Sequence, residues 1–398
     1  MISDKMVNLV NNSSVIRAMF EEGKRLAGIY GAENVYDFSL GNPNVPAPKA
    51  VNDAIKAVVD EENSVELHGY MSNSGYEDVR SVVAESLNRR FGTEFNDSNI
   101  IMTVGAAGGI NVLFKAIMNP GDEVITFAPY FGEYRAYTSN ADGKLVVVSP
   151  DTTTFQPNLD EFERLITPKT KVVIVNTPNN PTGVVYSEET IINISEILRR
   201  KQDEYNTSIV LFSDEPYREL AYDGVDVPYL TKYYDNTVIG YSFSKSLSLP
   251  GERIGYLVIP DELEDSESVK SACNVATRIL GFVNAPSLMQ KVIARCIDVD
   301  ISENISVYNR NRETLYKGLT ELGFDCVKPE GAFYMFVRTP MDDKEFSNIA
   351  KKYNILVVPG SSFACPGFVR IAYCVAYETI VKSLPEFRKL AEELGLVK

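Results

Sequence analysis

The chain has 398 residues and a formal net charge of −15, from 39 Lys and Arg against 54 Asp and Glu. Such an acidic surface repels nucleic acids and anionic membranes, so we expect neither as a partner. With 44% hydrophobic and 23% charged residues, the composition is that of a globular protein, and the length predicts two domains.

The first 14 residues, MISDKMVNLVNNSS, lack the long apolar core of a signal peptide, and no run in the chain approaches the roughly 20 apolar residues that span a bilayer. The five cysteines form no CxxC pair, which predicts free thiols in a cytoplasmic protein and no metal site. Because His68 is the single histidine, acid–base chemistry falls mainly to Lys, Tyr or carboxylates.

The first predicted elements are a helix near residues 14–28 and an extended segment, DFSLGNPNVPAP (37–48). A peptide this rich in Pro and Gly cannot continue a helix, so we expect it to pass between domains. We therefore assign residues 1–48 to an N-terminal segment that joins the smaller domain.

Through the middle of the chain, short apolar and β-branched runs alternate with helical patterns, such as the one around 187–204. The expected strands are IIMTV (100–104), DEVITF (122–127), KLVVV (144–148), KVVIV (171–175), SIVLF (208–212), TVIGY (237–241) and GYLVI (255–259). Continuous apolar strands that alternate with helices indicate an α/β fold with a mostly parallel sheet, of a seven-stranded type, covered on both faces. We assign residues 49–288 to this large domain.

The C-terminal part has a different pattern, with short alternating strands among helices around 287–321, 342–353 and 376–394. The expected strands are FDCV (324–327), AFYMFV (332–337), ILVV (355–358) and FVRIAY (368–373). This pattern predicts a smaller α+β domain, which we assign to residues 289–398.

Four polar motifs follow directly after apolar strands of the large domain. VGAAGG follows IIMT, NTPNNPTG follows VVIV, SDEPY follows VLF, and SFSK follows VIGY. In a parallel sheet these segments leave the same edge, where open α/β sheets bind their ligands. We therefore expect residues about 140 positions apart to meet in one crevice.

These motifs contain groups that suit a phosphorylated aromatic ligand. The small residues Gly105 to Gly109 open a helix and leave its amides free to meet an anion, which Ser242 and Arg253 are also suited to bind. Asp214 is a partner for a protonated ring nitrogen, and an ion pair at about 4 Å and an effective dielectric near 20 is worth about 4 kcal/mol before desolvation. Each residue type also has a structural alternative, such as a turn, a helix cap or a surface ion pair.

Taken together, the motifs resemble those of the fold-type I, class I and II aminotransferases, which use pyridoxal 5'-phosphate. SFSKSLSLPGERIGY (242–256) resembles the Schiff-base lysine segment of that family. NPTG (180–183), SDEPY (213–217) and the GNP of SLGNPNVPAP (39–48) are similar to its other marks, in the same order, and the resemblance runs from about residue 14 to the end. It implies the transferase fold of that family, and the transfer of an amino group from an L-amino acid to a 2-oxo acid.

The resemblance also implies roles for individual residues. Lys245 looks like the lysine that forms the Schiff base with the cofactor and then moves the substrate proton as base and acid. Asp214 matches the partner of the ring nitrogen, while Tyr217 and Asn180 match the partners of the ring 3'-oxygen. The phosphate would be bound by Ser242, Arg253 and the amides of Gly105, Ala106 and Ala107.

Further positions concern the substrate and a second subunit. Arg370, Gly41 and Asn180 match residues at the substrate, Arg370 being similar to the arginine that binds its α-carboxylate. Phe131 resembles the aromatic residue that stacks on the cofactor ring. Tyr70, in HGYMSNSGYEDVR, resembles the tyrosine that reaches the phosphate of the neighbouring subunit. This match implies a homodimer with shared active sites.

Other readings of the same residues stay open. The lysine, the aspartate and the arginine also serve β-lyases (carbon–sulfur lyases) and cyclases that use this cofactor. GAAGG lacks the hydroxyl residue of many relatives, and only Arg17 and Arg278 are candidates for binding a side-chain carboxylate. Two other classes are a non-catalytic cofactor-binding regulator, which the acidic charge disfavours, and a nucleotide-binding oxidoreductase, which the absence of GxGxxG spacing disfavours.

Overall fold

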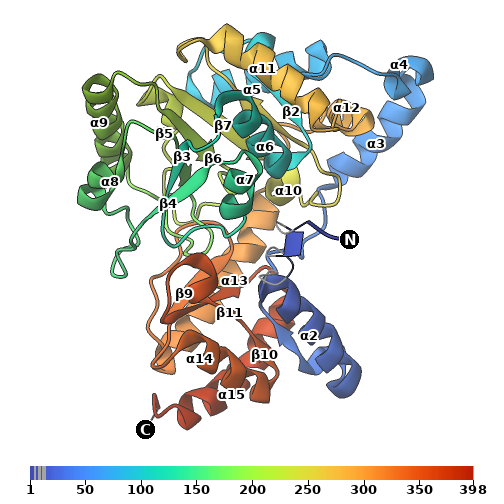
Figure 1. The fold of residues 1–398 in the computed structure, drawn as a ribbon. Coiled ribbons are helices and arrows are strands. Elements are labelled where there is room, and N and C mark those ends of the chain that lie inside the picture. Colours follow the sequence, from blue (N-terminus) through green and yellow to red (C-terminus); the bar gives the residue numbers. More distant parts are fainter. Residues whose placement is uncertain (4–5, 8–9, 11–14, 398) are drawn as a thin grey trace.

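The computed structural model describes residues 1–3, 6–7, 10 and 15–397, arranged as a larger part above a smaller part (Figure 1). The larger part contains a seven-stranded sheet with the strand order β2-β8-β7-β6-β5-β3-β4. Its strands are β2 (Ile100–Thr103), β3 (Glu123–Phe127), β4 (Lys144–Val148), β5 (Thr170–Asn176), β6 (Val210–Asp214), β7 (Thr237–Ser242) and β8 (Gly255–Val258).

The direction of the strands decides where their ends lie. Strand β8 is antiparallel to β2 and to β7, and every other neighbouring pair is parallel. The other six strands therefore run the same way, which confirms the expected mostly parallel sheet. The four polar motifs follow β2, β5, β6 and β7, so all four leave the same edge of the sheet.

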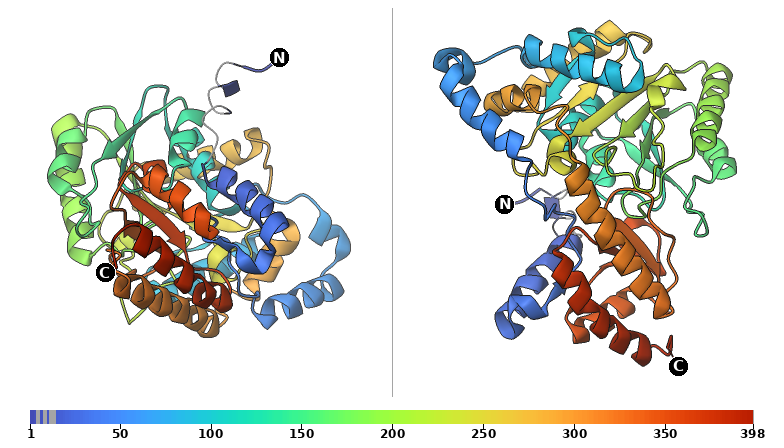
Figure 2. Two further views of the ribbon diagram at one scale, coloured as in Figure 1. Left: turned by 90° about the horizontal axis from the view of Figure 1, so that it is seen from below. Right: turned by 180° about the vertical axis from the view of Figure 1, so that it is seen from behind.

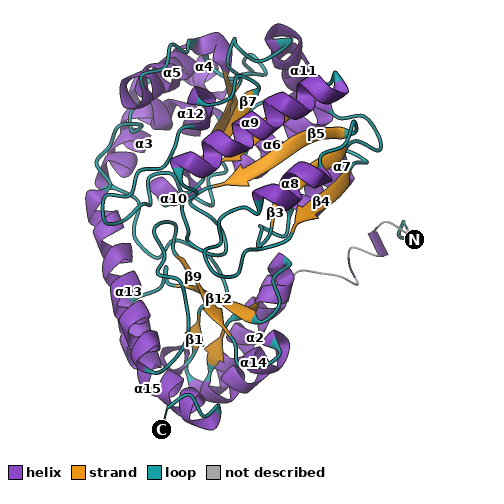
Figure 3. Cartoon of the chain, turned by 90° about the vertical axis from the view of Figure 1, so that its left-hand side faces the viewer, coloured by secondary structure: helices purple, strands orange, loops and turns teal. Residues whose placement is uncertain are grey.

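Both faces of the sheet are buried by helices. Successive side chains of a strand point to opposite sides, so each strand contributes to two cores. In β5, Val172 and Ile174 belong to the core on one face, and Val173 and Val175 to the core on the other. The first face packs against α6 (Gly105–Ile117), α7 (Tyr134–Asn140) and α11 (Ser266–Ile279). The second packs against α3 (Lys49–Glu61), α4 (Ser64–His68), α5 (Glu77–Phe91), α8 (Leu159–Leu165), α9 (Glu188–Tyr205) and α12 (Ser287–Ala294). Figure 3 shows α8 and α9 beside the sheet.

The predicted helix around 187–204 is confirmed as α9. The Ser187 hydroxyl caps it by accepting a hydrogen bond from the amide of Thr190, and the helix ends at Asn206 in the left-handed conformation. Its residues Ile191, Ile194 and Leu198 are fully buried, as their spacing on one face predicts.

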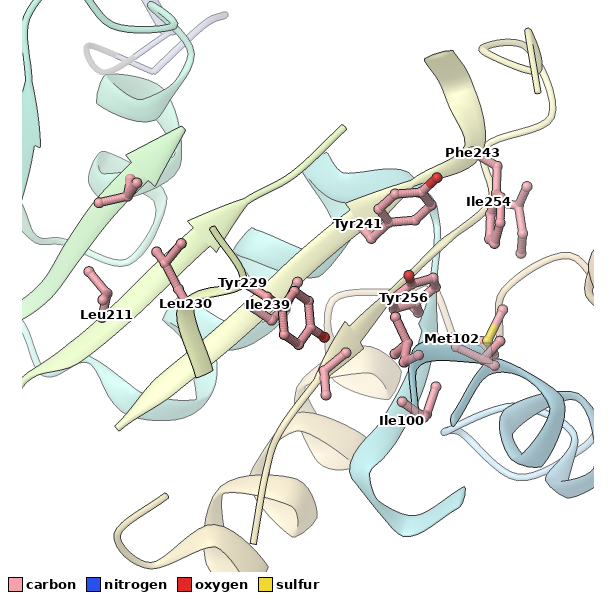
Figure 4. Packing of buried hydrophobic residues seen from close by; sticks show 14 of the residues in the cluster. Ile100, Met102, Leu211, Tyr229, Leu230, Ile239, Tyr241, Phe243, Ile254 and Tyr256 are labelled. Carbon is pink, nitrogen blue, oxygen red and sulfur yellow. The ribbon is translucent and has the colours of Figure 1, made fainter. Parts of the chain in front are cut away.

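Aromatic side chains fill the core between the sheet and helices α3, α4, α5, α8, α9 and α12, at the point where β7 ends (Figure 4). Tyr241 and Tyr256 stack with ring centroids 4.8 Å apart, and Phe243 packs edge-on against Tyr241 at 5.1 Å. Burying a phenylalanine side chain stabilises a fold by about 1.5–3 kcal/mol. Phe243 therefore anchors the short helix α10 (Phe243–Ser246), which begins directly after β7.

The smaller part combines a three-stranded antiparallel sheet of order β11-β12-β9 with a parallel pair, β1 and β10. Its strands are β1 (Tyr36–Asp37), β9 (Tyr334–Arg338), β10 (Ile355–Leu356), β11 (Val358–Pro359) and β12 (Phe368–Ala372). Its helices are α2 (Val15–Tyr30), α13 (Ser302–Glu321), α14 (Asp343–Ala350) and α15 (Tyr377–Glu393). Helix α2 is the helix expected near 14–28, although residue 14 lies outside the described residues.

Three expected elements differ in the structure, and one of them, ILVV, forms two short strands, β10 and β11, that belong to different sheets. FDCV forms no strand but an isolated bridge between Cys326 and Val337, and Pro329, which has no N–H to continue a ladder, follows shortly after. The helical stretch expected around 287–321 is interrupted between α12 and α13, where Asp298 accepts hydrogen bonds from Ser86 and Arg89 of α5. This tertiary contact is invisible in the local sequence pattern.

The interruption bears on the domain boundary expected between residues 288 and 289. Met289, Val292 and Ile293 of α12 are buried in the same core as α3 and α5, whereas Tyr308 and Leu315 of α13 belong to the core of the smaller part. We therefore propose a boundary near residue 301. Helix α13 runs from the larger part along the smaller one (Figure 2, right). Within the described residues, no helix combines the length and the apolar character needed to cross a bilayer.

Candidate active site

A cavity of about 400 Å³ lies where the four strand ends meet the smaller part. Of the thirteen predicted site residues, eleven line this cavity: Gly41, Ala106, Ala107, Phe131, Asn180, Asp214, Tyr217, Ser242, Lys245, Arg253 and Arg370. Gly105 directly precedes Ala106 at the start of α6. Tyr70 is elsewhere, on the surface, with 94% of its area exposed.

Lys245 reaches the cavity because the residues just before it fix the start of the short helix α10. The Ser242 hydroxyl caps the helix by accepting a hydrogen bond from the amide of Ser244, at 3.2 Å, and Phe243 is buried in the core. The ammonium group of Lys245 donates a hydrogen bond to the carbonyl oxygen of Gly41, at 2.7 Å. This contact joins the larger part to the N-terminal segment across 204 positions of sequence.

The amine of Lys245 loses its proton more easily than an ordinary lysine. Burial lowers its pKa to about 8, the nearby Cys374 opposes this shift, and the charges of Arg370 and Arg253 lower it further. A neutral amine is the nucleophilic form, so a sizeable fraction of Lys245 is reactive near neutral pH.

Asp214 lies at the end of β6, where its carboxylate is buried at the cavity wall. Tyr134 donates a hydrogen bond to its Oδ2 at 2.5 Å, and Asn176 donates one to its backbone carbonyl at 2.9 Å. Burial raises the pKa of Asp214 to about 6, although the hydrogen bond from Tyr134 acts in the opposite direction. The carboxylate is therefore poised to gain a positively charged partner, which would restore its ionised form.

The opposite end of the cavity suits an anion. Gly105 has a φ of +67°, and a Cβ atom there would lie 2.5 Å from Nη2 of Arg253. Only glycine therefore lets the start of α6 come this close to the guanidinium group. The hydroxyl groups of Ser242 and Ser244, 2.7 Å apart, lie beside the same wall. Amides at a helix start, two hydroxyls and a guanidinium form an anion-binding set.

Arg370 of β12 comes from the smaller part and is 2% exposed. Its guanidinium group lies between the rings of Tyr334 and Phe363, 4.6 and 4.9 Å from their centroids. Its Nη2 donates to the carbonyl of Ser39 at 2.6 Å and its Nη1 to Oδ1 of Asn180 at 3.1 Å, while its Nε has no partner among the described residues. A buried, incompletely satisfied guanidinium group is suited to bind a carboxylate.

Two tyrosines line the cavity near Arg370. Tyr217 and Tyr334 share a hydrogen bond between their hydroxyls at 2.9 Å. Tyr334 also packs so closely on the N-terminal segment that a Cβ atom on Gly41 would lie 1.9 Å from its hydroxyl oxygen. Burial raises the pKa of Tyr217, so its hydroxyl stays a donor at neutral pH.

The remaining predicted residues are placed as follows. Phe131 lines the cavity and meets Tyr134 edge-on, with centroids 5.7 Å apart. Arg278 is exposed on α11, and the side chain of Arg17 lies outside the described residues.

Several residues of the site were not predicted. Asn176 follows the strand-end rule and was open to prediction, because it is the first residue of NTPNNPTG. Tyr134, Tyr137 and Glu133 follow Phe131 in the segment PYFGEYRAY, where no spacing rule marks a partner for Asp214. Tyr334 was not predicted because its position in AFYMFV is that of an ordinary residue of a buried strand.

Known proteins that are similar to this chain are aminotransferases. The family model described as aminotransferase class I and II matches residues 33–382. An aspartate aminotransferase of Thermotoga maritima is 29% identical over 94% of this chain and 96% of its own. An aromatic-amino-acid aminotransferase of Thermococcus litoralis is 30% identical over 97% of each chain. The crystal structure of an aminotransferase from Eubacterium rectale has a TM-score of 0.95 and 48% identity over 99% of both chains.

Proposed function

Because this chain belongs to the class I and II aminotransferases and transfers amino groups with pyridoxal 5'-phosphate, we propose how its own residues carry out that reaction. The observation that carries the proposal is a single cavity in which the Lys245 amine, the Asp214 carboxylate and the Arg370 guanidinium group meet. The relatives are named for aspartate and for aromatic amino acids, so their names leave the preferred side chain open.

The cavity fits the cofactor by its donor set. Asp214 is a buried carboxylate whose pKa of about 6 favours gaining a cationic partner, as the protonated ring nitrogen would be. The phosphate would be held by the amides at the start of α6, by Ser242 and by Arg253, where the glycine at position 105 leaves room for the guanidinium group. Phe131 supplies an aromatic face, and Tyr217 and Asn180 supply donors for the ring oxygen.

When bound, the cofactor supplies an aldehyde carbon and a ring that accepts electrons. Lys245 would place its amine at this carbon and would act as the base for the proton on the substrate α-carbon. Its pKa of about 8 suits both tasks near neutral pH. Asp214 would keep the ring nitrogen protonated, and Tyr134 holds the carboxylate in place through its hydrogen bond.

Arg370 binds the substrate α-carboxylate in this proposal. The two flanking rings and the carbonyl of Ser39 fix its orientation, and Gly41 lets the backbone come close to the same carboxylate. The bound carboxylate then places the α-carbon near Nζ of Lys245, which turns proton transfer into a step between neighbouring groups.

The reaction is tested with a panel of amino donors and 2-oxo acid acceptors. We expect equal amounts of the new amino acid and the new 2-oxo acid, without release of ammonia. Lys245→Ala should lower the rate by about a hundred- to ten-thousandfold, whereas Lys115→Ala, at an exposed lysine of α6, should leave it unchanged. Pyruvate and ammonia formed without an acceptor would instead identify a β-lyase.

We also propose a homodimer in which Tyr70 completes the partner's site. Tyr70 is 94% exposed in the single chain, and Val65 and Ile279, 82% and 58% exposed, are apolar. Asn284 ties the segment after Tyr70 to the loop after α11 by donating to the carbonyl of Ser72, at 2.7 Å. These features support an interface that includes both segments.

The five cysteines are all free, which supports the cytoplasm as the location.

Hybrid dimers test the shared site. A Tyr70→Ala chain and a Lys245→Ala chain are each expected to be inactive, but a hybrid dimer has one intact site. Mixing equal amounts under conditions of subunit exchange should restore about a quarter of the wild-type activity, since half of the dimers are hybrids. A mixture that stays inactive while sedimentation shows exchange would contradict the shared site.

A further inference from the structure

Glu133 is a charged residue of the cavity that the reaction leaves without a role. Its side chain is exposed to solvent and yet lines the cavity, so it lies at the opening. Although Glu133 occupies the N-cap position of α7, its side chain makes no capping hydrogen bond. Tyr137, one turn further along α7, lines the same cavity, and its pKa is raised by burial and then by the charge of Glu133. The carboxylate is therefore close enough to influence groups inside.

The other charged residues that line the cavity within the described part of the chain already have partners in the proposed reaction. They are the cations Lys245, Arg253 and Arg370 and the anion Asp214. Lys245 takes part in amine exchange and Arg253 holds the phosphate. Arg370 binds the α-carboxylate, and Asp214 faces the ring nitrogen. No described cation of the lining remains for a second carboxylate of the substrate.

The substrate side chain is the part of an amino acid that these groups do not bind. In the proposed reaction, the buried Arg370 binds the α-carboxylate and the α-carbon lies beside Lys245. The substrate side chain therefore points toward the opening of the cavity, where Glu133 lies. We infer that Glu133 is a specificity-determining residue, which disfavours dicarboxylic substrates and favours donors with neutral or cationic side chains. This inference rests on the proposed function, because it assumes that Arg370 orients the substrate.

The size of the effect follows from Coulomb's law. For two charges about 6 Å apart at a partly hydrated site, with an effective dielectric of about 40–80, the energy corresponds to roughly a three- to tenfold change in kcat/KM. The sign depends on the substrate, because an anionic side chain is repelled and a cationic one attracted. Since Glu133 is exposed, salt should weaken both effects.

The test compares substrates that differ mainly by one charge, with the purified holoenzyme and one common 2-oxo acid. L-glutamine against L-glutamate measures the penalty for an anion, and L-lysine against L-norleucine measures the gain for a cation. The variants are Glu133→Gln and Glu133→Lys. The matched control is Glu196→Gln, at an exposed glutamate on α9 that does not line the cavity.

We expect Glu133→Gln to lower both kcat/KM ratios, glutamine over glutamate and lysine over norleucine, by about three- to tenfold, and Glu133→Lys to lower them further. Glutamate should thus gain relative to its neutral partner while lysine loses, a pattern that a merely structural disturbance would not produce. High salt should reduce both ratios in the wild type and leave them nearly constant in Glu133→Gln.

Two results would overturn the inference. One is a pair of ratios that the Glu133 variants do not change, and the other is a wild type that prefers glutamate to glutamine. A wild type that transaminates no donor at all would instead overturn the proposed function and, with it, this inference.

Discussion

Tyr134→Phe isolates the hydrogen bond that holds the carboxylate of Asp214. The substitution removes one hydroxyl group and keeps the ring, which is 1% exposed and packs against Tyr130 and Phe131. The lost contact is the 2.5 Å hydrogen bond to Oδ2 of Asp214. This bond stabilises the ionised carboxylate, so its loss should raise the pKa of Asp214.

The expected size follows from the strength of such a bond. A hydrogen bond to a charged group contributes about 1.5–3 kcal/mol, and one pKa unit corresponds to about 1.4 kcal/mol. The pKa of Asp214, about 6 with the bond in place, should therefore rise by roughly one to two units.

The effect on stability has a definite sign. Because the folded-state pKa of about 6 lies above the ordinary value of 3.8, the folded apoprotein binds this proton more tightly than the unfolded chain does. Its contribution to stability is therefore lost as the pH rises from about 4 through 6. In the variant the loss should continue through roughly pH 7–8.

Urea unfolding of the apoproteins at pH 5 and pH 8.5 measures this difference. The destabilisation caused by Tyr134→Phe should be about 1.5–3 kcal/mol larger at the higher pH. Tyr137→Phe, at another tyrosine of the cavity, should cost the same at both values, as should Tyr134→Phe in an Asp214→Asn background. A cost for Tyr134→Phe that does not depend on pH would refute the reasoning.

Three further predictions concern single residues. Burial lowers the pKa of Lys245 to about 8, so reductive methylation of the apoprotein, followed by mass spectrometry, should show a labelling midpoint near pH 8 at this residue; a midpoint above 10 would contradict it. In Gly41→Ala the new Cβ would lie 1.9 Å from the hydroxyl oxygen of Tyr334, so amino transfer should be lost while circular dichroism shows an intact fold; full activity would show that Tyr334 moves aside freely. Arg218→Met leaves the buried carboxylate of Glu215 without its cationic partner, which donates to it at 2.6 Å, and should cost about 3–5 kcal/mol in urea unfolding; a loss below about 1 kcal/mol would show that water replaces the arginine.

Much of the architecture was predictable because it depends on local pattern. Runs such as VVIV (172–175) are apolar at every position, and only a strand buried on both faces needs that, so the mostly parallel sheet was predicted and is confirmed. Parallel strands leave a sheet at one edge, and this rule alone predicted that Lys245, Asp214 and Asn180 would meet at one cavity.

Other features depend on contacts between distant segments. The bond between Tyr217 and Tyr334 joins positions 117 residues apart, and nothing near either tyrosine in the sequence marks its partner. In the break before α13, Asp298 likewise accepts hydrogen bonds from residues of α5 that lie 209 and 212 positions away.

The sequence by itself therefore determined the sheet and the edge at which the polar motifs emerge, because periodicity and strand direction are local properties. Only the tertiary structure decided which group holds Asp214, how far burial lowers the pKa of Lys245, and that Glu133 lies at the opening of the cavity. Those properties depend on distance and on exclusion of water, which arise only when segments far apart in the chain pack together.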